Sequence, residues 1–99
     1  MRLLVAIVHT EDANEIARAL SERAIQSTRI EAKGGFLAMP ATVFLIGVEK
    51  ERIEEVKSLI VEKSTGRTFT PAESAGEGGE ILIGGAVIFV LEVLEFVKL

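Results

Sequence analysis

The stretch LLVAIV at residues 3–8 decides the fold, because a run of six apolar residues is typical of a strand covered on both faces. A second, mainly apolar stretch of this kind, TVFLIGV, occupies residues 42–48. After each stretch the apolar residues change to helical spacing, over residues 11–24 and 49–63. Thr10 stands where a side chain caps the first of these helices. The sequence therefore predicts a strand followed by a helix, twice.

Two further strands complete the pattern. Residues 27–33 alternate between apolar and polar side chains, which predicts a half-exposed strand. Residues 81–94 predict a long apolar strand that Gly84 and Gly85 interrupt. The order is β-α-β-β-α-β, so we expect an α+β, ferredoxin-like fold with a four-stranded antiparallel sheet. Right-handed crossovers place the first and third strands in the middle of this sheet.

The composition limits the class of protein. The 99 residues are enough for a single domain, spanning residues 1–99. They carry 15 acidic and 11 basic side chains, for a net charge of −4, which argues against binding to nucleic acid in general. The absence of cysteine fits a cytoplasmic protein. The longest apolar run, residues 81–91, is shorter than the ~20 residues that span a bilayer, so no membrane insertion is expected.

Two segments suggest that the chain does not act as a lone domain. Residues 63–80 are rich in Gly, Ser and Thr, and we expect a flexible loop there, which is either functional or a connection without a task. The predicted strand at residues 81–94 lies at an edge of the sheet but lacks the charges that usually protect an edge. A second copy of the chain would cover it, which predicts a homo-oligomer.

No catalytic or metal-binding constellation is visible in the sequence. His9 is the only histidine and has no nucleophile paired with it, so a solvated strand end is favoured over a general base. We therefore expect no enzyme, no catalytic residue, no metal and no cofactor. Gly34 and Gly35 allow a backbone to approach a ligand closely and to offer N–H groups to an anion. Phe36, which follows them, either stacks on a base or packs into a neighbouring subunit.

Several motifs together carry a resemblance to a known family. They are Leu4-Val5-Ala6-Ile7-Val8, Thr28-Arg29-Ile30, Gly34-Gly35-Phe36-Leu37, Thr42, Phe44-Leu45, Gly47-Val48 and Gly84-Gly85-Ala86 with Phe89-Val90-Leu91. With them the chain resembles the PII-like cyclic di-AMP receptors, relatives of the nitrogen-regulatory PII signal transducers. The resemblance implies a homotrimer with three intersubunit clefts, each holding a cyclic dinucleotide. Binding would reshape loops that signal to an unknown downstream protein, without catalysis.

The resemblance also implies which residues bind the ligand. They are Thr28, Gly35, Phe36, Leu37, Gly47 and Phe89. A ligand with two negative charges needs cations as well, and the candidates are Arg29, Lys33 and Lys98. Gln26, Ala38 and Ala41 stand where family members that bind cyclic di-AMP carry Arg, Arg and Asn. These departures predict weak or absent binding of cyclic di-AMP, and leave open another nucleotide or a structural, protein-binding trimer that has lost its ligand.

Overall fold

A computed structural model of the chain describes residues 1–32, 40–64, 67–69, 81–83 and 85–99. The main sheet has the strand order β2-β3-β1-β6, and every neighbouring pair is antiparallel. The strands are β1 (Arg2–His9), β2 (Ser27–Ala32), β3 (Ala41–Val48) and β6 (Ala86–Glu92). The helices are α1 (Thr10–Glu22) and α2 (Ile53–Lys63), the latter preceded by a 3-10 turn, η1 (Lys50–Arg52). This confirms the predicted ferredoxin-like order, with the two most apolar strands in the centre.

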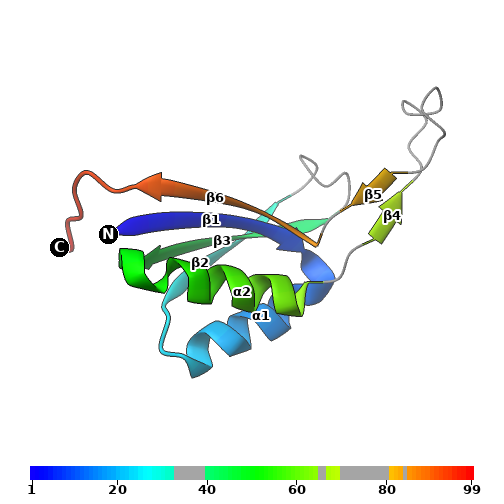
Figure 1. Cartoon of the computed structure of the whole chain (residues 1–99), viewed down its shortest axis with the longest axis horizontal. Coiled ribbons are helices and arrows are strands. Elements are labelled where there is room, and N and C mark those ends of the chain that lie inside the picture. The colour runs from blue at the N-terminus through cyan, green and yellow to red at the C-terminus, as the bar shows by residue number, and fades with distance from the viewer. Residues whose placement is uncertain (33–39, 65–66, 70–80, 84) are drawn as a thin grey trace.

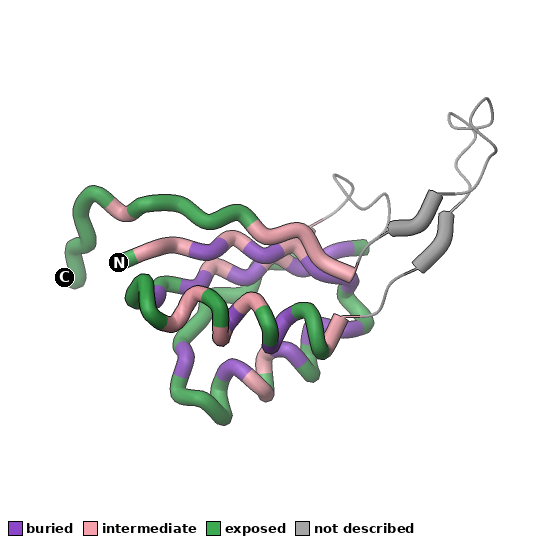
Figure 2. Tube along the Cα trace, viewed as in Figure 1, coloured by how far each residue is buried: buried purple, intermediate pink, exposed green. Residues whose placement is uncertain are grey.

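Both helices cover the same face of the sheet, below it in Figure 1. The core lies between these two layers. On β1 every second residue, Leu4, Ala6 and Val8, is fully buried against the helices. Phe44 and Ile46 of β3 lie beside them in register. The alternation of buried and less buried residues along β1 is visible in Figure 2. The period of two in the strands and of 3.6 in the helices thus brings one apolar layer against the other.

The other face of the sheet has no helix on it (Figure 1). We call it the open face. Because strand residues alternate between the two faces, the register places the following residues on it: Leu3, Val5 and Ile7 of β1, Thr28 and Ile30 of β2, Val43, Leu45 and Gly47 of β3, and Val87, Phe89 and Leu91 of β6. Ile30 and Phe89 are 47% and 43% exposed. Nearly all of these side chains are apolar, so the open face is a continuous apolar surface.

The predicted strand at residues 81–94 is wrong in one respect, because the structure divides it. Its first part forms β5 (Ile81–Ile83), which pairs with β4 (Arg67–Phe69) in a separate two-stranded sheet. Only β6 joins the main sheet, beside β1. The segment predicted as a loop at residues 63–80 thus includes a strand, β4, while residues 65–66 and 70–80 lie outside the described residues.

Two predictions at the start of α1 are also wrong. His9, not Thr10, occupies the N-cap position, and no side chain caps the helix there. The Thr10 hydroxyl instead lies 3.3 Å from the hydroxyl of Thr42, which connects α1 to β3. His9 is not a solvated strand end, since it is only 2% exposed. Neither of its ring nitrogens has a hydrogen-bond partner within the described part of the chain.

Candidate functional site

A cleft of about 900 Å³ lies where α1 ends and the chain turns into β2. Leu3, Leu45 and Gly47 of the central strands line one side of it. The turn at residues 24–28 lines another side, and Ala17 and Ser21 of α1 adjoin that turn. Met1 and, from the C-terminal tail, Val93 and Phe96 complete the lining. The cleft therefore combines segments from both ends of the chain.

The end of α1 fixes the shape of the turn. The Ile25 N–H donates to the Leu20 carbonyl at 2.9 Å, and the Ala24 N–H donates to the Ser21 carbonyl at 3.0 Å. These two bonds are those of a Schellman motif, in which the residue after the C-cap adopts a left-handed conformation. That residue is Ala24, with a φ of 58°. Ile25 and Leu20 are both buried, so the turn is held by apolar packing as well, and the residues after Ile25 emerge at the cleft.

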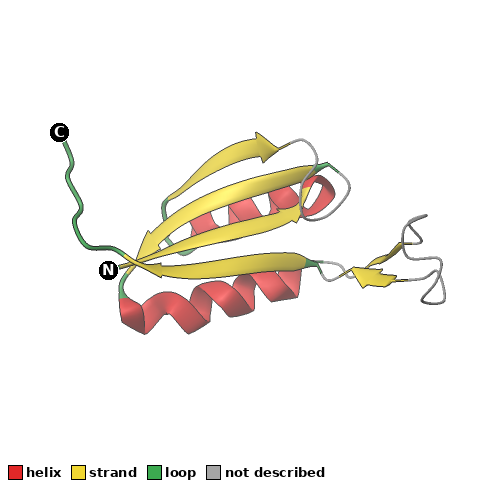
Figure 3. Cartoon of the chain, turned by 90° about the horizontal axis from the view of Figure 1, so that it is seen from above, coloured by secondary structure: helices red, strands yellow, loops and turns green. Residues whose placement is uncertain are grey.

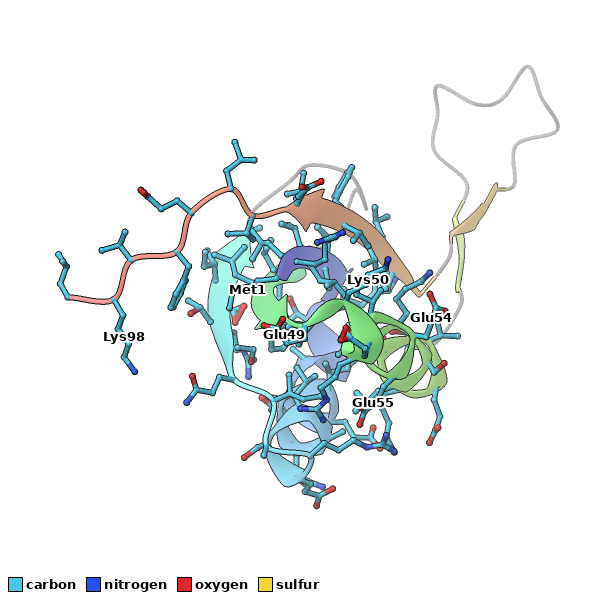
Figure 4. The ribbon with its side chains drawn as sticks, turned by 60° about the vertical axis from the view of Figure 1, so that its left-hand side comes forward. Met1, Glu49, Lys50, Glu54, Glu55 and Lys98 are labelled. Atoms are coloured by element: carbon cyan, nitrogen blue, oxygen red, sulfur yellow. The ribbon has the colours of Figure 1, made fainter. Side chains whose placement is uncertain are left out.

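A cluster of charged side chains connects this turn to α2. The Arg52 guanidinium donates to the carbonyl of Arg23 at 3.2 Å and to the Glu55 carboxylate at 3.0 Å. Arg23 forms a second ion pair with Glu55, at 3.4 Å. The hydrogen bond from Arg52 holds the pKa of Glu55 below its ordinary value, and the same bond raises the pKa of Arg52. Figure 4 shows Glu55 on α2. The cluster thus connects the end of α1 to α2 and adds polar contacts to the apolar packing of the turn.

The polar side chains of the cleft are neutral, and the one charged group of a lining residue is the N-terminal ammonium of Met1, which lies 3.9 Å from the Glu49 carboxylate. Ser21, Gln26, Ser27 and Thr28 line it, and the side chains of these four residues form no hydrogen bond with other described residues. No Lys, Arg, Asp or Glu side chain lines the cleft within the described ranges. The described part of the cleft therefore offers hydroxyl and amide groups to a ligand, next to an apolar floor.

Gly47 lies on that floor for a reason other than backbone freedom, because its backbone is not in the left-handed region. A methyl group added there would meet only the Met1 sulfur, at 3.8 Å, which is an ordinary contact. The folded chain alone thus does not require a glycine at this position. The missing side chain leaves room in the cleft instead.

The structure brings together two of the predicted ligand residues, Thr28 and Gly47. Arg29 lies on the helix-covered side of the sheet, where it pairs with Glu31 at 3.2 Å and donates to the Asn14 side chain at 2.8 Å. Phe89 lies on the open face opposite Val5. Neither Arg29 nor Phe89 lines the cleft, and their contact with a ligand stays a prediction.

The other predicted positions fall in different places. Gly35, Phe36 and Leu37, together with Lys33 and Ala38, lie outside the described residues. Lys98 lies near the end of the C-terminal tail (Figure 4). Of the three departures from the family pattern, Gln26 lines the cleft, whereas Ala41 is buried at the other end of β3, opposite His9.

Sequence reasoning missed Ser21, Ser27 and Phe96 as cleft residues. Serines on a helix and in a turn carry no distinguishing pattern. Phe96 could have been found from the sequence. It is an aromatic residue that follows the last predicted strand, where no core position is available to bury it, and this indicates a surface contact.

Comparison with known proteins agrees with this fold. The chain is similar to a protein from Pediococcus pentosaceus ATCC 25745 whose crystal structure is titled as that of a functionally unknown protein. The two share 31% identity and superimpose with a TM-score of 0.76, over 99% of this chain and 96% of that chain. A family model described as "Cyclic-di-AMP receptor" matches residues 1–99. This confirms the resemblance to PII-like receptors, and the chain belongs to the cyclic-di-AMP receptor family.

Proposed function

We propose that the protein is a homotrimeric, cytoplasmic signalling protein that senses a nucleotide in clefts closed between its subunits, with cyclic di-AMP as the first candidate ligand. Membership of a receptor family favours ligand sensing over catalysis. The observation that carries the proposal is the cleft itself. It contains Thr28 and Gly47, two residues that the family resemblance assigns to the ligand, together with an amide and hydroxyls that form no hydrogen bond with other described residues. A change of loop conformation on binding would signal to a downstream protein.

The open face supports the homotrimer. Its apolar residues span all four strands of the main sheet, and no helix of the described chain covers them. Large continuous apolar surfaces on soluble proteins mark interaction sites. A second copy of the chain presents the same surface, and a closed ring of such copies buries it on every subunit.

The position of the cleft connects assembly with binding. Leu3, Thr28, Leu45 and Gly47 belong both to the cleft lining and to the open face. A neighbouring copy packed on the open face would therefore form a further wall of the cleft. A ligand held there would contact two subunits.

A structural or protein-binding trimer without a ligand is the second candidate. The lack of charged side chains favours it, because the two phosphates of a cyclic dinucleotide gain most from charged donors, and no Lys or Arg lines the cleft within the described residues. Neutral hydrogen bonds contribute only about 0.5–1.5 kcal/mol each. The two candidates differ in whether a nucleotide binds at all.

Calorimetric titration of the purified chain with cyclic di-AMP, cyclic di-GMP and ATP separates them, with light scattering to measure its mass. We expect a trimer that binds one nucleotide per cleft. Gly47→Ala should remain folded, since among the described residues its added methyl meets only the Met1 sulfur, but should bind the ligand about tenfold more weakly, because crowding costs about 1–3 kcal/mol. A trimer that binds none of the nucleotides would favour the second candidate, and a monomer would contradict both.

A further inference from the structure

Five polar side chains on the helix-covered side of the sheet form a closed chain of contacts. They come from three elements, and we call them the polar ring: Thr10 and Asn14 of α1, Arg29 and Glu31 of β2, and Thr42 of β3. We infer that the polar ring holds β2 on α1 and thereby positions Thr28 for a ligand, with Arg29 and Glu31 as positioning residues. This inference rests on the proposed function, and it gives Arg29 a role other than contact with the ligand.

Each member of the polar ring contacts the next. The Thr42 hydroxyl donates to one oxygen of the Glu31 carboxylate at 2.9 Å, and Arg29 Nε donates to the other at 3.2 Å. Arg29 also donates from Nη1 to the side-chain oxygen of Asn14 at 2.8 Å. Because the single hydrogen of the Thr42 hydroxyl is used on Glu31, the Thr10 hydroxyl donates to Thr42 across their 3.3 Å contact. Thr10 and Asn14 are four residues apart on α1 and so lie on one face of it, which closes the ring.

The strand that the ring holds has little apolar packing of its own. β2 is an edge of the main sheet (Figure 3) and pairs with β3 alone among the described strands. Its residues from Ser27 to Glu31 are all exposed. Thr42, by contrast, is fully buried, so its hydroxyl depends on the Glu31 carboxylate as an acceptor. The ring thus connects an exposed strand to the buried layer of the fold.

The ring acts on the strand that carries Thr28. Thr28 and Arg29 are neighbours on β2, so their side chains point to opposite faces of the sheet. Thr28 lines the cleft, whereas Arg29 is bonded on the helix-covered side. Direct contact of Arg29 with a ligand in the cleft would require its guanidinium to leave the ring. The two roles of Arg29 therefore exclude each other.

Calorimetric titration with cyclic di-AMP separates these roles, because they give opposite signs for Glu31→Gln. If Arg29 positions β2, loss of the Glu31 charge weakens the ring, and we expect binding about three- to tenfold weaker. If Arg29 contacts the phosphates, the same change frees its guanidinium, so unchanged or tighter binding would overturn the inference. Arg29→Met should weaken binding to the same extent, and the double variant no further, because all three variants open one ring. Additive losses would overturn the inference as well.

Glu54→Gln is the matched control. It removes the same charge from an exposed ion pair on α2, in which Lys57 lies 3.1 Å from Glu54 (Figure 4). Any long-range effect of net charge on an anionic ligand is then the same in both variants. We expect Glu54→Gln to bind within about twofold of the unaltered chain, and a loss equal to that of Glu31→Gln would overturn the inference. Light scattering should give one mass for all variants, since exposed ion pairs contribute little to stability, and a Glu31→Gln chain that fails to assemble would show a merely structural role.

Hydrogen exchange of the ligand-free chain tests the hold on β2 without any nucleotide. We expect the backbone amides of residues 27–32 to exchange about two- to fivefold faster in Glu31→Gln, and those of α2 to be unchanged. Unchanged exchange in β2 would overturn the polar ring as its support. An unaltered chain that binds no nucleotide would overturn the proposed function and the role of the ring in binding, while the exchange rates would still decide whether the ring holds β2.

Discussion

Replacing Ala24 by glycine should stabilise the protein, although the change removes a methyl group and lies in the cleft. Ala24 is the one non-glycine residue with a positive φ among those the structure describes, at 58°. It holds this conformation because its N–H and that of Ile25 both bond back to α1. Glycine adopts the left-handed conformation without a clash of its side chain, so the same two bonds would form at lower cost.

The magnitude follows from two opposing effects. The left-handed conformation costs an L-residue about 1–2 kcal/mol, which glycine does not pay. Glycine loses more backbone entropy on folding, which costs about 0.4–1 kcal/mol relative to alanine. Ala24 is exposed, so its methyl group contributes little burial. We therefore expect Ala24→Gly to raise the free energy of unfolding by about 0.5–1 kcal/mol.

Urea unfolding followed by circular dichroism measures this difference, at several protein concentrations because assembly contributes to stability. Ala19→Gly is the matched control, since it makes the same chemical change within α1, where Ala19 packs against the core. A glycine in a helix interior costs about 1 kcal/mol, so this variant should change stability in the opposite direction. If both variants lose stability equally, the left-handed turn does not exist in solution, and the account of how the cleft is positioned is wrong.

Two further substitutions test the charge cluster and the open face. Because Arg52 holds the pKa of Glu55 below its ordinary value of 4.5, the ionised carboxylate stabilises the fold fully above that value, and the contribution is lost as the pH falls through the lowered native pKa. Glu55→Gln should therefore be less stable than the unaltered chain at neutral pH, and urea unfolding across a pH series should show the gap closing in acid; a gap independent of pH would contradict this. Phe89→Asp should give a folded monomer by light scattering and circular dichroism, because Phe89 is 43% exposed in the single chain whereas assembly would bury an unpaired charge. A Phe89→Asp trimer would show that this part of the open face is not an interface.

The central strands of the sheet could be predicted because a strand that is buried on both faces has apolar residues at nearly every position. Residues 3–8 and 42–48 are apolar without alternation, and they became β1 and β3, the two inner strands. The alternation at residues 27–33 marked β2 as an edge strand, and β2 does pair on one side only, although its side chains are exposed on both faces and not on one as predicted. These patterns depend on each strand's own environment, so a single segment of sequence is sufficient to reveal them.

Pairing between distant segments could not be predicted in the same way. The apolar run at residues 81–94 does not indicate which neighbour each part selects, and its first three residues pair with β4, whose sequence Arg-Thr-Phe carries no strand pattern of its own. His9 shows a similar limit. Its position at a strand end predicted exposure, but the burial of a side chain depends on what the rest of the chain places over it.

The cleft was predictable only where the family resemblance marked it. Thr28 and Gly47 came from that resemblance, and the structure brings them to one cleft. Phe96 joins them from the tail, and no local pattern connects a residue there with a turn at the end of α1. Gln26 was visible as a departure from the family, and the structure places it in the lining of the cleft.

The lack of charged side chains in the cleft and the apolar open face together predict that nucleotide binding and assembly depend on each other. With a net charge of −4 and no charged side chain in the described cleft lining, the chain gains little from long-range attraction to an anionic ligand. Affinity must then come from short contacts, and some of these contacts would belong to the neighbouring copy that we propose to close the cleft. A ligand that binds only the closed cleft stabilises the assembled state by mass action, so nucleotide binding and assembly would strengthen each other. Phe89→Asp, which lies outside the described cleft lining, should therefore weaken binding and assembly together, whereas weakened binding by an intact trimer would point to direct contact of Phe89 with the ligand.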